Sequence, residues 1–408
     1  MRRFAMSALV AVIPLVLVAL LLAVSSPTWS QGKEPITIGG SMAYTGAFAG
    51  PVSQWTYGWK DYMEQVNAAG GVNGRKIVMV EADDEYKAEA ALAIYKRLMA
   101  AHKIPLFLLS GSPQVAMVYP VAQRQQVPIM TIGAETHAFA NPKEYPYYFG
   151  TVLNTYTDQG RVTLRFIKDQ AEREKKPVPK VGVLISSQLV WGVETERGLK
   201  PYADKLGIKY HFEHIESGAT SAFEQLQRLK DAGAEWLLIY HSPAIFSLSV
   251  KNANEIGYKP NIATFHWSLW EPIIESLGPL SDGLVIVIPW IPPAAQIDHP
   301  GLRKINALYH KAGRRDAATI LYPLGYVKAA ITVEALRQAG DNLAAANIKS
   351  AFERIRNFDV EGLAPPITIS PEDHRGNMTY YFWRVKDRKY QKIGEASLDR
   401  REAVLEVK

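Results

Sequence analysis

Residues 65–84, QVNAAGGVNGRKIVMVEADD, constrain the fold of this chain more than any other segment. A helical pattern runs up to the glycines, and Gly70, Gly71 and Gly74 then allow a tight turn, because glycine adopts positive φ without steric cost. The apolar, β-branched run 76–80 that follows is typical of a buried strand. The segment therefore predicts a helix, a glycine turn and a strand in direct succession.

The same alternation of strand and helix continues along the chain. Apolar runs that predict strands lie at 36–40, 76–80, 105–109, 127–132, 180–185, 208–214, 236–240, 262–266 and 284–288. Helical patterns separate most of them, which is typical of parallel sheets covered by helices on both faces. A final pair at 378–385 and 390–393 indicates an antiparallel addition. The 408 residues exceed one ordinary core, so we expect two α/β lobes.

Three segments near the start of this pattern carry a resemblance to a known family. They are ITIGGSMAYTG from residue 36, VNAAGGVNGRKI from residue 66, and the acidic pair Asp83-Asp84. Together they resemble the beginning of the type I periplasmic binding proteins, and most of all the branched-chain amino acid (leucine/isoleucine/valine) binding proteins of ABC transporters. The resemblance continues to about residue 385 and does not specify a ligand.

The resemblance implies two Rossmann-like lobes, joined by three crossovers near residues 150, 283 and 370. Each lobe is then discontinuous in sequence. We assign 1–31 to a signal peptide, 32–150 plus 284–370 to an N-terminal lobe, and 151–283 plus 371–408 to a C-terminal lobe.

The first 30 residues differ in composition from the rest of the chain. Met1-Arg2-Arg3 is basic, 8–24 is apolar, and 25–30 is small and polar. This order predicts a secretory signal peptide cleaved near Ser30 or Gln31 and a soluble protein of the periplasm; the alternative is a membrane anchor. The chain contains no cysteine, which excludes disulfides, thiol catalysis and a lipoprotein anchor.

The charge pattern argues against a nucleic-acid partner. The formal net charge is +6, but the basic residues are scattered and form no stripe along a face. We therefore interpret them as solvated surface.

Candidate ligand contacts follow the strands at 105–109 and 127–132, because ligands of open parallel sheets bind beyond the carboxyl ends of the strands. A serine-rich loop that opens a helix can hold an anion on its N–H groups and hydroxyls. By the family resemblance, these two loops form a carboxylate clamp; the alternative is an ordinary cap and turn. A carboxylate at position 135 would repel a bound carboxylate, so we expect its side chain to point elsewhere or to pair with a base. The candidates are Ser110, Gly111, Ser112, Ala134, Glu135 and Thr136.

The other lobe should close over the ligand. Amino-acid-binding members of the family place an acidic residue near the position of His266, to pair with the ligand ammonium. Here no acid follows until Glu271, and a buried ammonium without a counter-charge costs several kcal/mol. We therefore expect α-amino acids to be poor ligands, and an aromatic or aliphatic acid to be sandwiched by aromatic side chains, although each of these could instead belong to a lobe core. The candidates are Tyr44, Phe48, Trp191, His241, His266, Trp267 and Tyr326.

No catalytic or metal-binding motif is recognisable, and we predict neither an enzyme nor a cofactor. The leading prediction is a periplasmic solute-binding protein of an ABC importer, a monomer that hinges shut over a small carboxylate and docks on a membrane permease. The alternative is a ligand-sensing receptor, or an amide- or amino-acid-responsive regulator, with the same fold. The export signal favours the importer.

Overall fold

Two sheets organise the chain in the computed structural model, which describes residues 33–46, 48–132, 141–152 and 155–400. The first sheet has the order β2-β1-β3-β4-β5, and all of its pairs are parallel. Its strands are β1 (Ile36–Met42), β2 (Ile77–Asp83), β3 (Phe107–Leu109), β4 (Ile129–Thr131) and β5 (Tyr148–Phe149). The alternating α/β pattern of the sequence correctly predicted this parallel architecture.

The second sheet has the order β12-β11-β10-β9-β8-β6-β7. Its pairs are parallel from β7 to β10 and antiparallel from β10 to β12, so the predicted antiparallel addition is confirmed. Its strands are β6 (Val181–Ile185), β7 (Tyr210–His214), β8 (Trp236–Tyr240), β9 (Asn261–Phe265), β10 (Val285–Ile288), β11 (Thr379–Lys386) and β12 (Lys389–Ser397).

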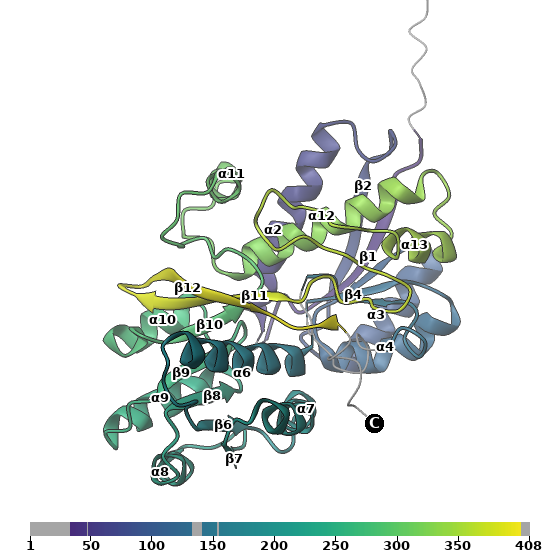
Figure 1. The fold of residues 1–408 in the computed structure, drawn as a ribbon. Coiled ribbons are helices and arrows are strands. Elements are labelled where there is room, and N and C mark those ends of the chain that lie inside the picture. Colours follow the sequence, from purple (N-terminus) through teal and green to yellow (C-terminus); the bar gives the residue numbers. More distant parts are fainter. Residues whose placement is uncertain (1–32, 47, 133–140, 153–154, 401–408) are drawn as a thin grey trace, which may run out of the picture. The chain divides into compact units, whose positions relative to one another are not determined.

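Helices accompany each sheet (Figure 1). With the first sheet lie α2 (Ala49–Ala68), α3 (Ala88–Ala101), α4 (Ser112–Arg124), α12 (Leu321–Ala339) and α13 (Ala345–Phe352), and α11 (Pro300–Lys311) contacts α2. With the second sheet lie α6 (Tyr156–Arg173), α7 (Val190–Leu206), α8 (Phe223–Asp231), α9 (Pro243–Glu255), α10 (Glu271–Leu277) and the 3₁₀ helix η1 (Gly278–Ser281). We call these two assemblies the first and second lobes. Both belong to one compact unit, Pro35–Lys408.

The glycine turn between α2 and β2 has the predicted geometry. Gly70, Gly71 and Gly74 have φ of 103°, 80° and 77°, and a Cβ on Gly71 would lie 2.0 Å from the Arg75 carbonyl oxygen. Asn67 fastens the end of the helix to the next strand, because its side-chain oxygen accepts a hydrogen bond from the Ile77 N–H and its amide donates one to the Ile77 carbonyl. The turn therefore fixes the direction in which β2 leaves α2.

Close approach of α2 and α12 also depends on glycine (Figure 1). A Cβ on Gly58 would lie 2.0 Å from the Tyr322 carbonyl oxygen, and one on Gly325 would lie 1.9 Å from the Trp55 carbonyl oxygen. The two helices therefore pack backbone against backbone, which places the buried face of α12 beside the first sheet.

The second crossover lies later in the chain than we predicted. We placed it near residue 283 and assigned 284–370 to the N-terminal lobe. The structure pairs β10 with β9 in parallel and with β11 in antiparallel orientation, so 285–288 belongs to the second sheet and the chain crosses after Ile288. The other passages run from Phe149 at the end of β5 to Tyr156 at the start of α6, and through Arg375, which forms a bridge with Thr151.

No helix in the described ranges is both long and apolar enough to cross a membrane. The predicted signal peptide, 1–31, lies outside the described residues.

Candidate functional site

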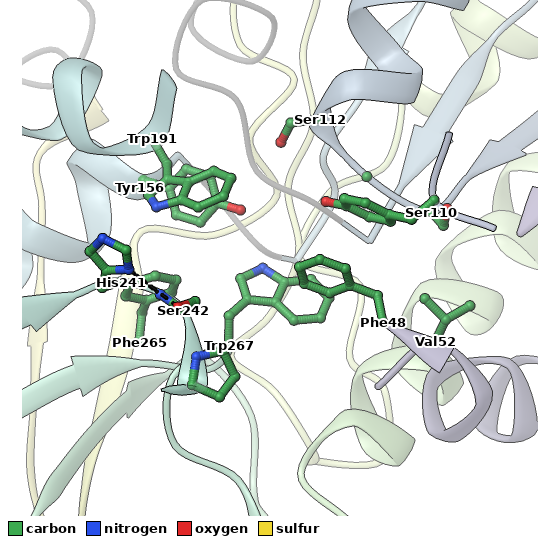
Figure 2. Close-up of a pocket in the computed structure, with 13 residues that line it drawn as sticks. Phe48, Val52, Ser110, Ser112, Tyr156, Trp191, His241, Ser242, Phe265 and Trp267 are labelled. Atoms are coloured by element: carbon green, nitrogen blue, oxygen red, sulfur yellow. Dashed lines mark hydrogen bonds between the residues drawn. The ribbon is translucent and has the colours of Figure 1, made fainter. Parts of the chain in front are cut away.

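A cavity that is partly open to solvent lies between the two lobes. Figure 2 shows Phe48, Val52, Ser110 and Ser112 on one side, and Tyr156, Trp191, His241 and Phe265 on the other, with Trp267 reaching between them. Its lining is mostly aromatic and includes no carboxylate among the described residues. The lining consists of Phe48, Val52, Tyr86, Ser110, Gly111, Ser112, Tyr156, Trp191, His241, Ser242, Pro243, Phe265 and Trp267.

Strand ends position most of this lining. Tyr86 follows β2, Ser110 and Gly111 follow β3, and the segment 241–243 follows β8, so all lie at the carboxyl ends of parallel strands. Phe265 ends β9, and Trp267 comes two residues later. Both sheets therefore turn the same kind of edge, the one that binds ligands in open α/β folds, toward one cavity.

Aromatic rings from the two lobes meet across the cavity. Phe48, which precedes α2, stacks on Tyr86 with ring centroids 4.1 Å apart and an interplanar angle of 25°. The Phe48 ring also makes an edge contact with Trp267 of the second lobe, at 6.5 Å and 89°. Tyr156 packs edge-on against Phe265 at 5.4 Å. These rings form a wall suited to an apolar or aromatic group.

Asp84 holds the first-lobe side of the cavity in place. Its carboxylate accepts hydrogen bonds from the Ser41 hydroxyl at 2.7 Å and the Tyr86 N–H at 2.8 Å, and a longer one from the Ser110 hydroxyl at 3.4 Å. Burial raises the pKa of Asp84 above its usual range. Asp84 is therefore a positioning residue for Tyr86 and Ser110.

His241 contributes a neutral ring. Its Nδ1 accepts a hydrogen bond from the Ser242 N–H at 2.8 Å, which leaves Nε2 to donate to the Ile215 carbonyl at 3.0 Å. Burial lowers the pKa of His241, in agreement with this tautomer. The cavity therefore receives the ring of His241 without a positive charge.

A sequence profile of the family described as "periplasmic binding protein" matches residues 35–390. The chain belongs to this family. The match covers both lobes, and the two-lobed α/β structure with parallel sheets is the type I fold that the sequence resemblance implied.

Similar proteins carry the names of different ligands. The chain is 24% identical over 266 residues to the "Leu/Ile/Val-binding protein homolog 7" of Brucella abortus; the alignment covers 59% of this chain and 62% of that protein. It also resembles in fold a branched-chain amino acid ABC transporter protein from Thermus thermophilus with bound valine (TM-score 0.78, 21% identity, 90% and 97% of the two chains). A "fatty acid ABC transporter substrate-binding protein" from Thermomonospora curvata is similarly close (TM-score 0.76, 22% identity, 92% and 95%).

Seven of the predicted ligand-binding residues line the cavity of this periplasmic binding protein. They are Phe48, Ser110, Gly111, Ser112, Trp191, His241 and Trp267. α4 begins at Ser112, with Gly111 as its N-cap. Ala134, Glu135 and Thr136 lie outside the described residues.

The structure places three other candidates away from the cavity lining. The Tyr44 hydroxyl donates to Glu81 of β2 at 2.6 Å. Tyr326 is buried in α12, where its hydroxyl donates to Glu361 at 3.0 Å. His266 is fully buried behind Trp267, at 4.6 Å between ring centroids.

Sequence reasoning missed six lining residues as binding candidates. Phe265 and the pair Ser242-Pro243 follow strands, so the strand-end rule could have found them. Val52 and Tyr156 lie in the first turns of α2 and α6, and no sequence pattern distinguishes them from core positions. The sixth is Tyr86, which follows the acidic pair Asp83-Asp84 and stacks on Phe48.

Gly111 brings the wall of the cavity close to its backbone. A Cβ on Gly111 would lie 2.6 Å from ring atoms of Tyr86, so we expect Gly111→Ala to push that ring off Phe48. We predict roughly tenfold weaker ligand binding in the variant, because a displacement of about 1 Å disrupts a well-packed wall. Calorimetry measures the change in Kd, and the double variant Gly111→Ala/Tyr86→Ala is the control. The effects of the two substitutions on the binding free energy should be strongly non-additive. Full additivity would contradict the contact between Gly111 and Tyr86.

Proposed function

We propose that this chain is the substrate-binding protein of an ABC importer and that it captures a small acid with an apolar or aromatic body. The family, the two lobes and the cavity between them support this role. The observation that carries the ligand class is the composition of the cavity: six aromatic rings face a serine-rich loop at the start of α4.

The serine-rich loop is suited to a carboxylate. The first N–H groups of a helix have no acceptor within the helix, and here the first helical bond of α4 is donated by Val115 to the Gly111 carbonyl. The N–H groups of Gly111 and Ser112 and the Ser112 hydroxyl can therefore turn toward an anion in the cavity. Ala134, Glu135 and Thr136 remain predicted partners of the same carboxylate.

Our expectation that α-amino acids are poor ligands is not borne out by the comparisons, since named relatives include amino acid-binding proteins. The described lining holds no carboxylate to pair with an ammonium. Matched ligands decide between α-amino acids and acids without an ammonium group. Two pairs differ only in that group: phenylalanine and 3-phenylpropanoate, and leucine and 4-methylpentanoate. Tighter binding of the two amino acids would assign the chain to that class.

A thermal-shift screen tests the proposal as a whole. A ligand that binds only the folded state raises the melting temperature by mass action, by an amount that grows with its concentration. We expect shifts with carboxylates that carry apolar bodies. A shift with sugars or amides and none with any carboxylate would overturn the proposed ligand class.

Trp267 should provide a large part of the binding energy. The Trp267 side chain lies between the lobes and contacts Phe48. Trp267→Ala therefore removes an aromatic surface that both lobes use to enclose the cavity. We predict at least a thirtyfold increase in the Kd for 3-phenylpropanoate or for the acid with the largest thermal shift, because a buried aromatic anchor is commonly worth 2 kcal/mol or more. Trp270→Ala, which removes a neighbouring tryptophan outside the cavity lining, is the control, and equal losses would contradict the assignment.

Export and delivery complete the proposed role. The predicted signal peptide places the protein in the periplasm, and closure of a monomer around its ligand prepares it for a membrane permease. Secretion of the full chain with loss of its N-terminal segment, measured by mass spectrometry of the periplasmic fraction, tests this proposal.

A further inference from the structure

Two basic side chains are buried together where the lobes meet, and the carboxylate clamp does not include them. Lys328 comes from α12 of the first lobe and His266 from the residue after β9 of the second, and neither is exposed to solvent. The charge of Lys328 acts on His266. The histidine ring lies 4.6 Å from Trp267 and 5.8 Å from Trp290, between ring centroids.

The electrostatic state of this pair is unusual. Lys328 Nζ donates a hydrogen bond to the Thr131 carbonyl, and neither nitrogen of His266 has a hydrogen-bond partner among residues 33–46, 48–132, 141–152 and 155–400. In the part of the chain that the structure describes, no carboxylate acts on the charge of either side chain. Burial lowers the pKa of Lys328 to about 7, and burial together with Lys328 holds the pKa of His266 well below its usual range. A negative charge brought nearby would therefore restore the ammonium form of Lys328.

The pair lies directly beside the cavity on both sides. Thr131, which accepts the hydrogen bond from Lys328, is in register with Leu109, and the cavity residues Ser110 and Gly111 follow Leu109. On the second lobe, His266 stands between Phe265 and Trp267, which both line the cavity. An anion held at the serine-rich loop would thus lie close to Lys328, and the burial of this lysine strengthens the Coulomb attraction between the two charges.

We propose that Lys328 forms a cationic subsite at the seam between the lobes, with the neutral ring of His266 as a second donor, and that it neutralises the carboxylate of a bound acid once the lobes close. This inference rests on the proposed function. It assigns the counter-charge for the ligand to α12, outside the strand-end loops. His266 serves as a second donor, because one nitrogen of its neutral ring carries a hydrogen.

The same pair predicts a proton balance for binding. If Lys328 is partly neutral in the empty protein, an acid that binds as its carboxylate must be accompanied by proton uptake to form the ammonium. A buried lysine that serves only to hold the Thr131 carbonyl would give no such uptake. Proton uptake therefore distinguishes a ligand-binding role from a purely structural one.

The experiment uses the full chain and a pair of isosteric probes, 3-phenylpropanoate and 3-phenylpropanamide, with 4-methylpentanoate and its amide as a second pair. Their Kd values are measured by calorimetry for the wild type, Lys328→Met, His266→Phe and the control Lys304→Met, whose lysine pairs with Glu361 at the surface. Titrations at pH 8 in phosphate and in Tris, which differ in ionisation enthalpy, give the number of protons taken up.

We expect the wild type and Lys304→Met to prefer the acid over its amide and to take up a fraction of a proton on binding. In Lys328→Met the affinity for the acid should fall by roughly thirtyfold or more, with little change for the amide, and proton uptake should vanish. His266→Phe should lower the affinity for the acid by a smaller factor.

The outcomes separate the two proposals. If acids bind with no proton uptake and Lys328→Met binds them as tightly as the wild type, the cationic subsite is wrong while the proposed function stands. A second outcome concerns Glu135. If Glu135→Gln binds acids more tightly and takes up protons that the wild type does not, Glu135 is the partner of Lys328 and the subsite is wrong. If no carboxylate of the thermal screen binds, the proposed ligand class is wrong and the subsite is wrong with it.

Discussion

Replacing Arg375 with methionine is expected to lower the free energy of unfolding by about 3–5 kcal/mol, the range for breaking a buried ion pair. The Arg375 side chain is fully buried and contacts Asp373 through Nε at 2.8 Å and Nη2 at 3.0 Å, and Asp158 through Nη1 at 3.3 Å. Methionine would leave the Asp158 carboxylate, which is 1% exposed, without its cation. Arg400 can still neutralise Asp373 through its 2.8 Å contact.

The same substitution at Arg165 is the control. Arg165 pairs with Asp169 one turn away on α6, but their side chains are 41% and 35% exposed, so water already solvates both charges. Arg165→Met should change stability by less than about 0.5 kcal/mol. Urea denaturation monitored by tryptophan fluorescence measures both variants. A loss below about 1 kcal/mol for Arg375→Met would show that the network at the third crossover is well solvated or rearranges freely.

The fold was largely predictable because its signals are local. Each strand of a parallel sheet is buried on both faces, so it reads as a short apolar run, and the helices between them supply the alternation. The glycine turn at 70–74 was recognisable because only glycine tolerates those φ angles easily. The second crossover was not predictable in the same way, since the run 284–288 is equally apolar in either sheet and only its pairing with β9 assigns it.

The site was predictable only in part, for a reason that Tyr44 and Tyr86 illustrate. Both are aromatic residues in loops after strands of the first sheet, yet Tyr86 lines the cavity while Tyr44 turns to Glu81. The difference depends on hydrogen bonds to Asp83 and Asp84, which hold the backbone of each loop: Asp83 accepts from the Tyr44 N–H and Asp84 from the Tyr86 N–H. A single sequence gives no measure of such long-range contacts.

Lys328 shows a second limit. It lies in YPLGYVKAAITV, a helix segment whose other residues are apolar or small, and a lysine in such a pattern is usually assumed to reach solvent. Here α12 is buried between α2 and the first sheet, so the ammonium cannot reach water and contacts Thr131. Only the packing of three elements reveals this burial.

The stability of the empty protein should depend on pH through Lys328. Because the folded pKa, about 7, lies below the unfolded value of about 10.5, the unfolded state binds more protons between these two pH values. Folding is therefore penalised most at pH 7 and below, and stability rises with pH through this window. Each pH unit should recover up to about 1.4 kcal/mol until the lysine is neutral in both states.

Lys328→Met removes the penalty while it keeps most of the side-chain volume. We expect the variant to be more stable than the wild type by about 2–4 kcal/mol at pH 7, even though it loses the hydrogen bond to Thr131, and the advantage should shrink steadily toward pH 10. Urea denaturation from pH 6 to pH 10 measures the free energy of unfolding of the wild type and of Lys328→Met. Lys304→Met, which removes an exposed lysine, should show the same pH dependence as the wild type. A stability difference that does not change with pH would mean that Lys328 remains charged when the site is empty. It would then need a permanent counter-ion, and the anionic ligand could not be the group that supplies its charge.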